Sequence, residues 1–179
     1  NKALFLDRDG VINIEKNYVI KRTDFEFIPD IFDACKYFQE LGFKLIIITN
    51  QSGIARGFYS EQELNELHKW VKSIFQSKNI EILDIYYCPH HPNYGEECKC
   101  RKPKPGLILD AIEKYDIDHR RSILIGDKIT DVLAGRNAKV GENLLVKTGH
   151  KFTQPEGESS FPEFESMSEI VKWHKSLAK

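Results

Sequence analysis

The sequence predicts an α/β protein with a Rossmann-like, three-layer α/β/α architecture, in which helices cover both faces of a central parallel sheet. Two observations support this prediction. Short, almost continuously apolar runs alternate along the chain with longer segments of helical periodicity, and such alternation is typical of parallel strands joined by covering helices. The chain has 179 residues, 41% hydrophobic and 30% charged, which suits one domain over residues 1–179 with a sizeable core.

The expected strands are five short apolar runs, most of which end at a polar residue or a turn signal. Runs of this kind are typical of strands that are buried on both faces. In chain order they cover residues 3–7, 44–49, 83–87, 122–126 and 143–147.

The expected helices lie between these strands and after the last of them. In chain order they cover about residues 30–41, 60–78, 106–116, 128–138 and 166–177. Ser60 and Glu63 form the pattern of a capping box at the start of the second helix. Leu64, Leu67 and Val71 recur at helical spacing, which predicts a stripe that faces the core rather than a cofactor.

Three segments interrupt the alternation. Residues 10–29 form a long excursion after the first strand, and residues 88–105 form a loop rich in cysteine, histidine, proline and glycine after the third. Residues 150–165 have the composition of a surface loop before the last helix.

Composition and charge argue against several kinds of partner. The formal net charge is -1, so nothing favours binding to nucleic acid or to an anionic membrane surface. No apolar run approaches the length of a membrane span, and the first residues have the pattern of a strand rather than a signal peptide. We therefore expect a cytoplasmic protein with no nucleic-acid or membrane partner.

The first strand ends in the sequence Asp7-Arg8-Asp9-Gly10. Residues i and i+2 of a strand share a side, so Asp7 and Asp9 can point together out of its carboxyl end, where open α/β sheets bind ligands. Two carboxylates placed there repel each other unless a cation or a shared proton compensates them. The alternative is a pair of solvated turn aspartates, since aspartate is a common turn residue.

Polar residues follow other strands as well. Thr49 and the turn over 50–53 supply a hydroxyl, amides and backbone N–H groups suited to an anion. Asp127 follows the fourth strand, with Asp131 one helical turn later, and Lys102 comes just before a helix start. Such starts favour anions.

Together these strand ends predict phosphoryl transfer. Carboxylates with substrate phosphate oxygens are the usual ligands of Mg²⁺, and a carboxylate can act as a nucleophile by forming an aspartyl-phosphate. Taken singly, Thr49, Asn50 and Asp127 could be helix caps, and Lys102 could be a solvated loop lysine. These plainer interpretations do not explain why such residues coincide at the ends of parallel strands.

The loop after the third strand carries a second pattern, Cys88, His90, Cys98 and Cys100. Three thiolates and one imidazole on a short loop form a closed tetrahedral ligand set for Zn²⁺, which is typical of a structural site. A disulfide is disfavoured in a cytoplasmic chain. His91 is the alternative to His90 as the fourth ligand.

These motifs resemble those of the haloacid dehalogenase superfamily of phosphotransferases. Residues 7–10 match its first motif, Thr49 its second, Lys102 its third, and Asp127 with Asp131 its fourth. The zinc loop and the run Ser52-Gly53-Ile54-Ala55-Arg56-Gly57 resemble the branch that contains histidinol-phosphate and heptose-bisphosphate phosphatases. The similarity covers nearly the whole chain. Val11 departs from it, since threonine is usual there.

The resemblance implies a role for each motif residue. Asp7 attacks the phosphate, while Asp9 protonates the leaving alkoxide and then activates water. Mg²⁺ is held by Asp7, the backbone carbonyl of Asp9 and Asp127, and the phosphoryl oxygens are stabilised by Thr49 and Lys102. Asp131 is expected to orient the neighbouring loop. Substrate contacts are expected from Glu15, Lys16, Asn17, Tyr18, Asn50, Gln51, Ser52, Arg56, Arg101 and Lys128.

The resemblance implies a monomeric, Mg²⁺-dependent phosphatase without a cap domain, because residues 10–29 are too short to form one. Its substrate would be a small phosphorylated sugar used to make nucleotide-activated heptose for bacterial lipopolysaccharide. Arg56 and Arg101 favour a doubly anionic substrate. The alternatives are a histidinol-phosphate phosphatase, a polynucleotide 3′-phosphatase and a zinc-loop binding module without turnover. As a proton donor, Asp9 would need a raised pKa in the complex.

Overall fold

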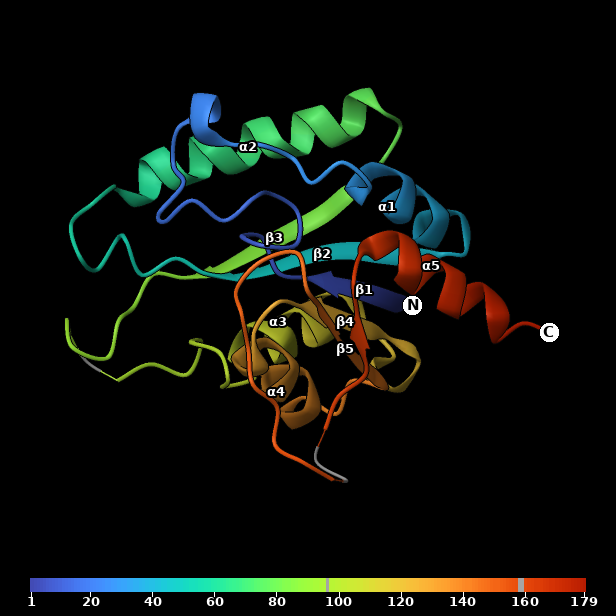
Figure 1. Ribbon diagram of the computed structural model, residues 1–179. Helices are drawn as coiled ribbons and strands as arrows, with labels where there is room; N and C mark the ends of the chain where they lie inside the picture. Colours follow the sequence, from blue (N-terminus) through green and yellow to red (C-terminus); the bar gives the residue numbers. More distant parts are fainter. Residues whose placement is uncertain (96, 158–159) are drawn as a thin grey trace.

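A six-stranded parallel sheet forms the centre of the computed structural model, which describes residues 1–95, 97–157 and 160–179 (Figure 1). The strand order is β3-β2-β1-β4-β5-β6, and every neighbouring pair is parallel. The strands are β1 (Lys2–Leu6), β2 (Phe43–Asn50), β3 (Ile82–Cys88), β4 (Ile123–Gly126), β5 (Glu142–Val146) and β6 (Glu163–Phe164). The predicted parallel α/β architecture is confirmed.

Helices cover both faces of this sheet, as Figure 1 shows. Residues of α1, α2 and α5 pack in the apolar cluster on one face, and residues of α3 and α4 pack in the cluster on the other. The helices are α1 (Ile31–Glu40), α2 (Glu61–Ser77), α3 (Gly106–Tyr115), α4 (Ile129–Asn137) and α5 (Met167–Ser176), with single-turn helices at Arg22–Asp24 and His119–Arg121. The capping box predicted for α2 is present: the Ser60 hydroxyl accepts a hydrogen bond from the Glu63 amide at 3.1 Å. None of the described helices is long and apolar enough to cross a bilayer.

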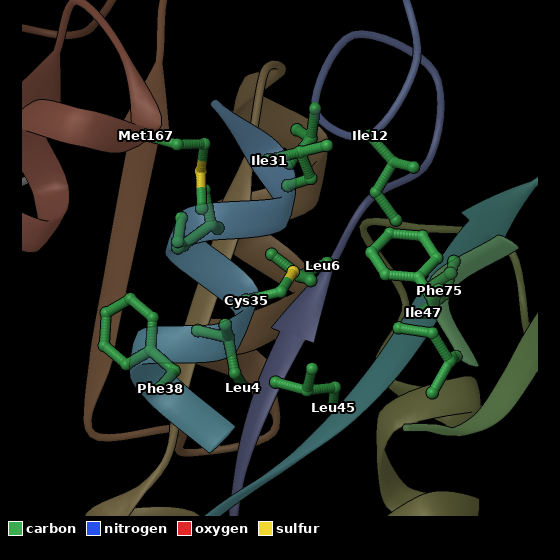
Figure 2. Close-up of a cluster of buried hydrophobic side chains, with 14 of the residues drawn as sticks. Leu4, Leu6, Ile12, Ile31, Cys35, Phe38, Leu45, Ile47, Phe75 and Met167 are labelled. Carbon is green, nitrogen blue, oxygen red and sulfur yellow. The ribbon is translucent and has the colours of Figure 1, made fainter. Parts of the chain in front are cut away.

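The core follows from the alternation of side chains along buried strands. On β1, Leu4 and Leu6 face one cluster while Phe5 faces the other, and all three are fully buried. Figure 2 shows Cys35 and Phe38 of α1 above the first of these faces. Burying one side chain of this size contributes about 1.5–3 kcal/mol to the free energy of folding, so the clusters on both faces stabilise the sheet.

The segment 150–165 differs from its prediction as a surface loop. Residues Glu163–Phe164 form β6, in which Glu163 pairs with Leu145 and Phe164 with Val146 of β5. This part of the prediction was wrong because two residues are too few to show the alternation that marks a strand. The pairing forms because β5 would otherwise leave the backbone N–H and C=O groups of its outer edge unpaired.

Strand register places the ends of β1, β2 and β4 side by side. Leu6 pairs with Ile47 on one side and with Ile125 on the other. Asp7 follows directly, and its amide donates to the Ile125 carbonyl at 3.1 Å. In Figure 1 the long segments after β1, β2 and β3 extend from this end of the sheet, which is the edge where open α/β sheets bind ligands.

Candidate active site

A cavity of about 520 Å³ opens at the carboxyl edge of the sheet. Its lining includes most of the residues that the sequence singled out, drawn from the ends of β1 and β2, the start of α4 and three long loops. The predicted residues that line it are Asp7, Asp9, Glu15, Asn17, Tyr18, Thr49, Asn50, Gln51, Ser52, Arg101, Lys102, Lys128 and Asp131. The fold therefore brings distant motifs of the sequence into one site.

Lys102 is the fixed cation of this site. Its ammonium contacts Asp7 Oδ1 at 2.8 Å and Asp131 Oδ1 at 2.7 Å, and it donates to the Ile48 carbonyl at 2.9 Å. These contacts use all three donors of a lysine. Burial alone would lower the pKa of Lys102, but Asp131 and Asp7 outweigh that effect and raise it. Lys102 is therefore charged and held in one position.

Asp7, Asp127 and Asp131 form a buried carboxylate cluster whose ligand atoms lie within 4.8 Å of one another. Burial, followed by the charge of Asp131, raises the pKa of Asp7 well above its usual value. The same two causes raise the pKa of Asp127 to about 6. Lys102 compensates only part of this negative charge, so the cluster favours an additional cation.

The oxygens of this cluster differ in what they can offer a metal. Asp127 Oδ1 is buried and has no hydrogen-bond partner among the described residues. Asp131 has both oxygens engaged, Oδ1 by Lys102 and Oδ2 by the amides of Asp127 and Lys128 at 3.1 and 3.0 Å. A hard cation such as Mg²⁺ fits Asp7 and Asp127, while Asp131 holds the turn between β4 and α4.

Residues 148–150, for which the sequence predicted no role in the site, hold the Asp127 carboxylate in place. Its Oδ2 accepts the amide of His150 at 2.8 Å and lies 2.6 Å from His150 Nδ1. A Cβ built on Gly10 or on Gly149 would come within 2.2 Å of the same oxygen, and Gly10 has a φ of +92°. Only glycine permits this close approach. The Thr148 hydroxyl donates to the Gly10 carbonyl at 2.7 Å, which joins the two segments.

Asp9 has the opposite electrostatic environment from Asp7. Its Oδ1 accepts from Arg8 at 2.8 Å and from Asn13 at 3.0 Å, and its Oδ2 accepts from Gln51 at 3.0 Å. Burial favours a higher pKa, but Arg8 and these hydrogen bonds outweigh it and lower the pKa of Asp9. In the ligand-free protein Asp9 is thus an anion, and any proton that it donates must be acquired on binding.

The end of β2 carries a connected set of polar side chains. Gln51 donates from Nε2 to Thr49 Oγ1 at 2.9 Å, and its Oε1 accepts from the Tyr59 hydroxyl at 2.5 Å. Asn50 exchanges hydrogen bonds with the backbone of Lys102, accepting at 3.1 Å and donating at 3.4 Å. The sequence analysis missed Tyr59, which also lines the cavity, because an aromatic residue just before a helix is most simply core.

Two predicted substrate residues lie outside the cavity lining. The Lys16 ammonium pairs with Glu26 at 3.0 Å. Arg56 is exposed, donates to the Tyr18 hydroxyl, and stacks near the rings of Tyr18, Phe58 and Tyr94 at 5.6, 5.3 and 5.6 Å. Arg56 therefore joins three loops at the rim of the site, where it lies next to Tyr18.

The Cys/His loop forms a second cluster beside the cavity. The ligand atoms of Cys88, His90, Cys98 and Cys100 all lie within 4.8 Å of one another. Cys88 Sγ is 3.7 Å from Cys98 Sγ, and His90 Nδ1 is 3.2 Å from Cys100 Sγ. Three sulfurs and one imidazole nitrogen at this spacing fit a closed tetrahedral zinc site. His91 is not a member of this cluster and lines the cavity instead.

Comparison with known proteins finds a matching family model and relatives that cover most of the chain. A family model described as HAD-hydrolase-like matches residues 99–165. The D-glycero-beta-D-manno-heptose-1,7-bisphosphate 7-phosphatase of Pasteurella multocida is 41% identical over 98% of both chains. The corresponding alpha-named enzyme of Campylobacter jejuni is 47% identical over 97% of this chain and 96% of that one.

A solved structure shares the fold over almost its whole length. It is the D,D-heptose 1,7-bisphosphate phosphatase from B. bronchiseptica, complexed with magnesium and phosphate. The TM-score is 0.85 with 28% identity, and the match covers 99% of each chain.

Proposed function

Because this chain belongs to the D-glycero-D-manno-heptose-1,7-bisphosphate 7-phosphatases, within the HAD-like hydrolases, we propose that its cavity removes the C7 phosphate through an aspartyl-phosphate on Asp7. The observation that carries this proposal is the buried pair of Asp7 and Lys102, 2.8 Å apart at the end of β1. A buried carboxylate held beside a fixed cation is suited to attack a phosphoryl group.

The first step transfers the phosphoryl group to the protein. An Asp7 carboxylate oxygen forms a bond to phosphorus as the bond between phosphorus and the C7 oxygen breaks. The electron pair of that bond remains on the leaving oxygen, which takes the proton held by Asp9. The products of the step are the dephosphorylated C7 hydroxyl, an aspartyl-phosphate and an ionised Asp9.

The second step regenerates Asp7. Ionised Asp9 takes a proton from water, and the water oxygen bonds to phosphorus as the bond from phosphorus to Asp7 breaks. Inorganic phosphate leaves, and Asp7 returns to a carboxylate. Asp9 is ionised in the free protein, as a base must be, because Arg8 and its hydrogen-bond partners outweigh burial and lower its pKa.

The charges around the phosphoryl group are met by residues of several segments. Lys102 and the Thr49 hydroxyl would contact its oxygens, since both line the cavity near Asp7. We assign Mg²⁺ to Asp7, Asp127 and the Asp9 carbonyl. When bound there, it supplies positive charge that offsets the carboxylates and the phosphoryl oxygens.

The Cys/His loop would hold a structural Zn²⁺ and place the adjacent cations. Arg101 and Lys102 directly follow Cys100, and Arg101 donates to the His90 carbonyl at 3.2 Å. Fixing Cys98 and Cys100 by a metal therefore fixes the position from which both cations reach the cavity. Arg101 and Lys128 line it and would meet the rest of the anionic sugar.

The proposal is tested by comparing substrates on one preparation of the full chain with Mg²⁺ and Zn²⁺ present. Phosphorus NMR should show that both tested anomers of the heptose bisphosphate lose the C7 phosphate and keep the phosphate at C1. We expect kcat/KM for the preferred anomer to exceed that for histidinol phosphate by at least about a hundredfold, because the second phosphate adds charge-assisted contacts. Faster turnover of histidinol phosphate, or release of the C1 phosphate, would overturn the proposal.

A further inference from the structure

Arg8 is the largest of the fully buried side chains in the described part of the molecule, with no exposed surface. One of its terminal nitrogens donates to Asp9 Oδ1 and to the Val19 carbonyl, both at 2.8 Å. The other lies 3.2 Å from Nε2 of His68 on α2. A buried guanidinium is costly unless it is paired, so these contacts hold Arg8 in one orientation.

His68 can receive Arg8 only as a neutral ring. A guanidinium has donors and no acceptor, so His68 Nε2 must accept and carry no proton. Burial, followed by the charge of Arg8, lowers the pKa of His68 to about 3. His68 is 5% exposed and lines no part of the cavity, so its contact with the site runs through Arg8.

The Asp9 carboxylate is held from two sides. Oδ1 accepts from Arg8, which His68 holds, and from Asn13 at 3.0 Å. On the other side Gln51, itself held by the Tyr59 hydroxyl, donates to Oδ2 at 3.0 Å. A general acid must lie within hydrogen-bond reach of the oxygen that it protonates. The orientation of this carboxylate therefore decides whether Asp9 reaches the leaving oxygen.

We propose that Arg8 and His68 form a positioning pair that orients the Asp9 carboxylate toward the leaving oxygen of the substrate. This inference rests on the proposed function, in which Asp9 is the general acid. Because the same guanidinium nitrogen donates to Val19, the pair also ties this orientation to the segment after β1 that carries Glu15, Asn17 and Tyr18.

The proposal predicts an effect that depends on the leaving group. A sugar alkoxide needs a proton as it departs, whereas p-nitrophenolate is a good leaving group and departs without one. The ratio kcat/KM reports the steps up to the first irreversible one, here phosphoryl transfer, so it does not include the later use of Asp9 as a base. Misorienting Asp9 should thus lower kcat/KM for the sugar phosphate and spare p-nitrophenyl phosphate.

The test compares His68→Leu with the parent chain on both substrates. We expect kcat/KM for the heptose bisphosphate to fall about tenfold, a part of the hundredfold or more that general acid catalysis contributes. For p-nitrophenyl phosphate we expect a change of less than about twofold, since attack by Asp7 is intact. His68→Gln, which keeps an acceptor, should restore most of the loss on the sugar.

Val71→Ala is the matched control, because Val71 is a buried residue of α2 one turn from His68. It should lower the melting temperature without changing the ratio of the two kcat/KM values. If His68→Leu does not fold, Arg8→Lys tests the same step, since lysine keeps the charge but lacks the guanidinium fork. Equal losses on both substrates, or no loss on the sugar, would overturn the inference. A parent chain without activity on the heptose bisphosphate would instead overturn the proposed function.

Discussion

The two clusters of this protein that could hold a metal ion are built in opposite ways. In the carboxylate cluster Asp7 and Asp127 directly follow β1 and β4, Asp131 lies in the first turn of α4, and all three are buried. The Cys/His cluster begins at the last residue of β3 and continues through a loop, with His90 exposed and Cys98 and Cys100 partly exposed. The fold places the carboxylates before any ion binds, whereas the residues of the Cys/His loop would be held together mainly by a bound metal.

This difference teaches what each metal would supply. At the strand ends the geometry exists already, and a cation offsets the repulsion that raises the pKa values of Asp7 and Asp127. In the loop, a metal supplies shape, because regular secondary structure is absent from the described residues between β3 and α3. Changes at the first cluster should therefore affect chemistry, and changes at the second should affect stability.

The largest expected effect is the loss of activity in Asp7→Asn. We expect kcat to fall by more than about a thousandfold, because the nucleophile is removed. The melting temperature should stay within about 4 °C of the parent, since β1 and its register are unchanged. Steady-state kinetics and a thermal melt on the same sample measure both. Retention of a tenth of the parent activity would show that Asp7 is not the nucleophile.

For Cys98→Ser we expect the opposite result, a large loss of stability and a smaller loss of activity. Loss of one thiolate should release zinc and lower the melting temperature by roughly 5 °C or more, because the metal stabilises the folded loop. Activity should fall mainly through a higher KM, because Arg101 loses its fixed position while Asp7 and Asp131 still hold Lys102. Metal analysis, calorimetry and kinetics test this together. An unchanged zinc content and melting curve would contradict the zinc assignment.

A smaller effect is expected at His150, which contacts a candidate metal ligand, than at a histidine that is itself a candidate metal ligand. In the strand-end cluster His150 contacts Asp127, whereas His90 belongs to the loop cluster itself. We expect His150→Ala to weaken Mg²⁺ binding about tenfold, as loss of a supporting partner commonly does. Calorimetric titration of Mg²⁺ into the resting protein measures this. His91→Ala, which changes another histidine of the cavity lining, should bind Mg²⁺ as the parent does.

The remaining expected effect concerns stability in acid. The pKa of His68 is lowered to about 3 from an ordinary value of 6.5, first by burial and then by Arg8. Between these values the unfolded chain binds a proton that the native chain does not, so the free energy of unfolding falls as the pH falls from 6.5 towards 3. His68→Leu should show a shallower slope in urea denaturation over this window. Equal slopes would show that His68 is protonated in the native protein.

Much of this site was predictable because its chemistry follows regular elements. The i, i+2 spacing placed Asp7 and Asp9 at the end of an apolar run, and the cysteine spacing marked the loop cluster. These signals are local, so they can be recognised without knowing the fold.

The supporting residues were not predictable in the same way. His150 reaches Asp127 from a loop after β5, and His68 reaches Arg8 from the middle of α2. Neither has a distinctive spacing, and their partners are 23 and 60 residues away. Lys16 shows where such signals are weakest. In an irregular segment no periodicity shows which way a side chain points, and Lys16, predicted to contact substrate, pairs with Glu26 outside the cavity lining.

The central claim is that the C7 phosphoryl group passes through Asp7, and rapid-quench mass spectrometry tests it most directly. The full chain, loaded with Mg²⁺ and Zn²⁺, is mixed with a slight deficit of heptose bisphosphate, quenched in acid within milliseconds and digested. We expect one phosphoryl group on the peptide that contains Asp7, rising and then decaying as inorganic phosphate appears. Full conversion of substrate with no phosphorylated peptide at any time, or with the phosphoryl group on another peptide, would contradict it.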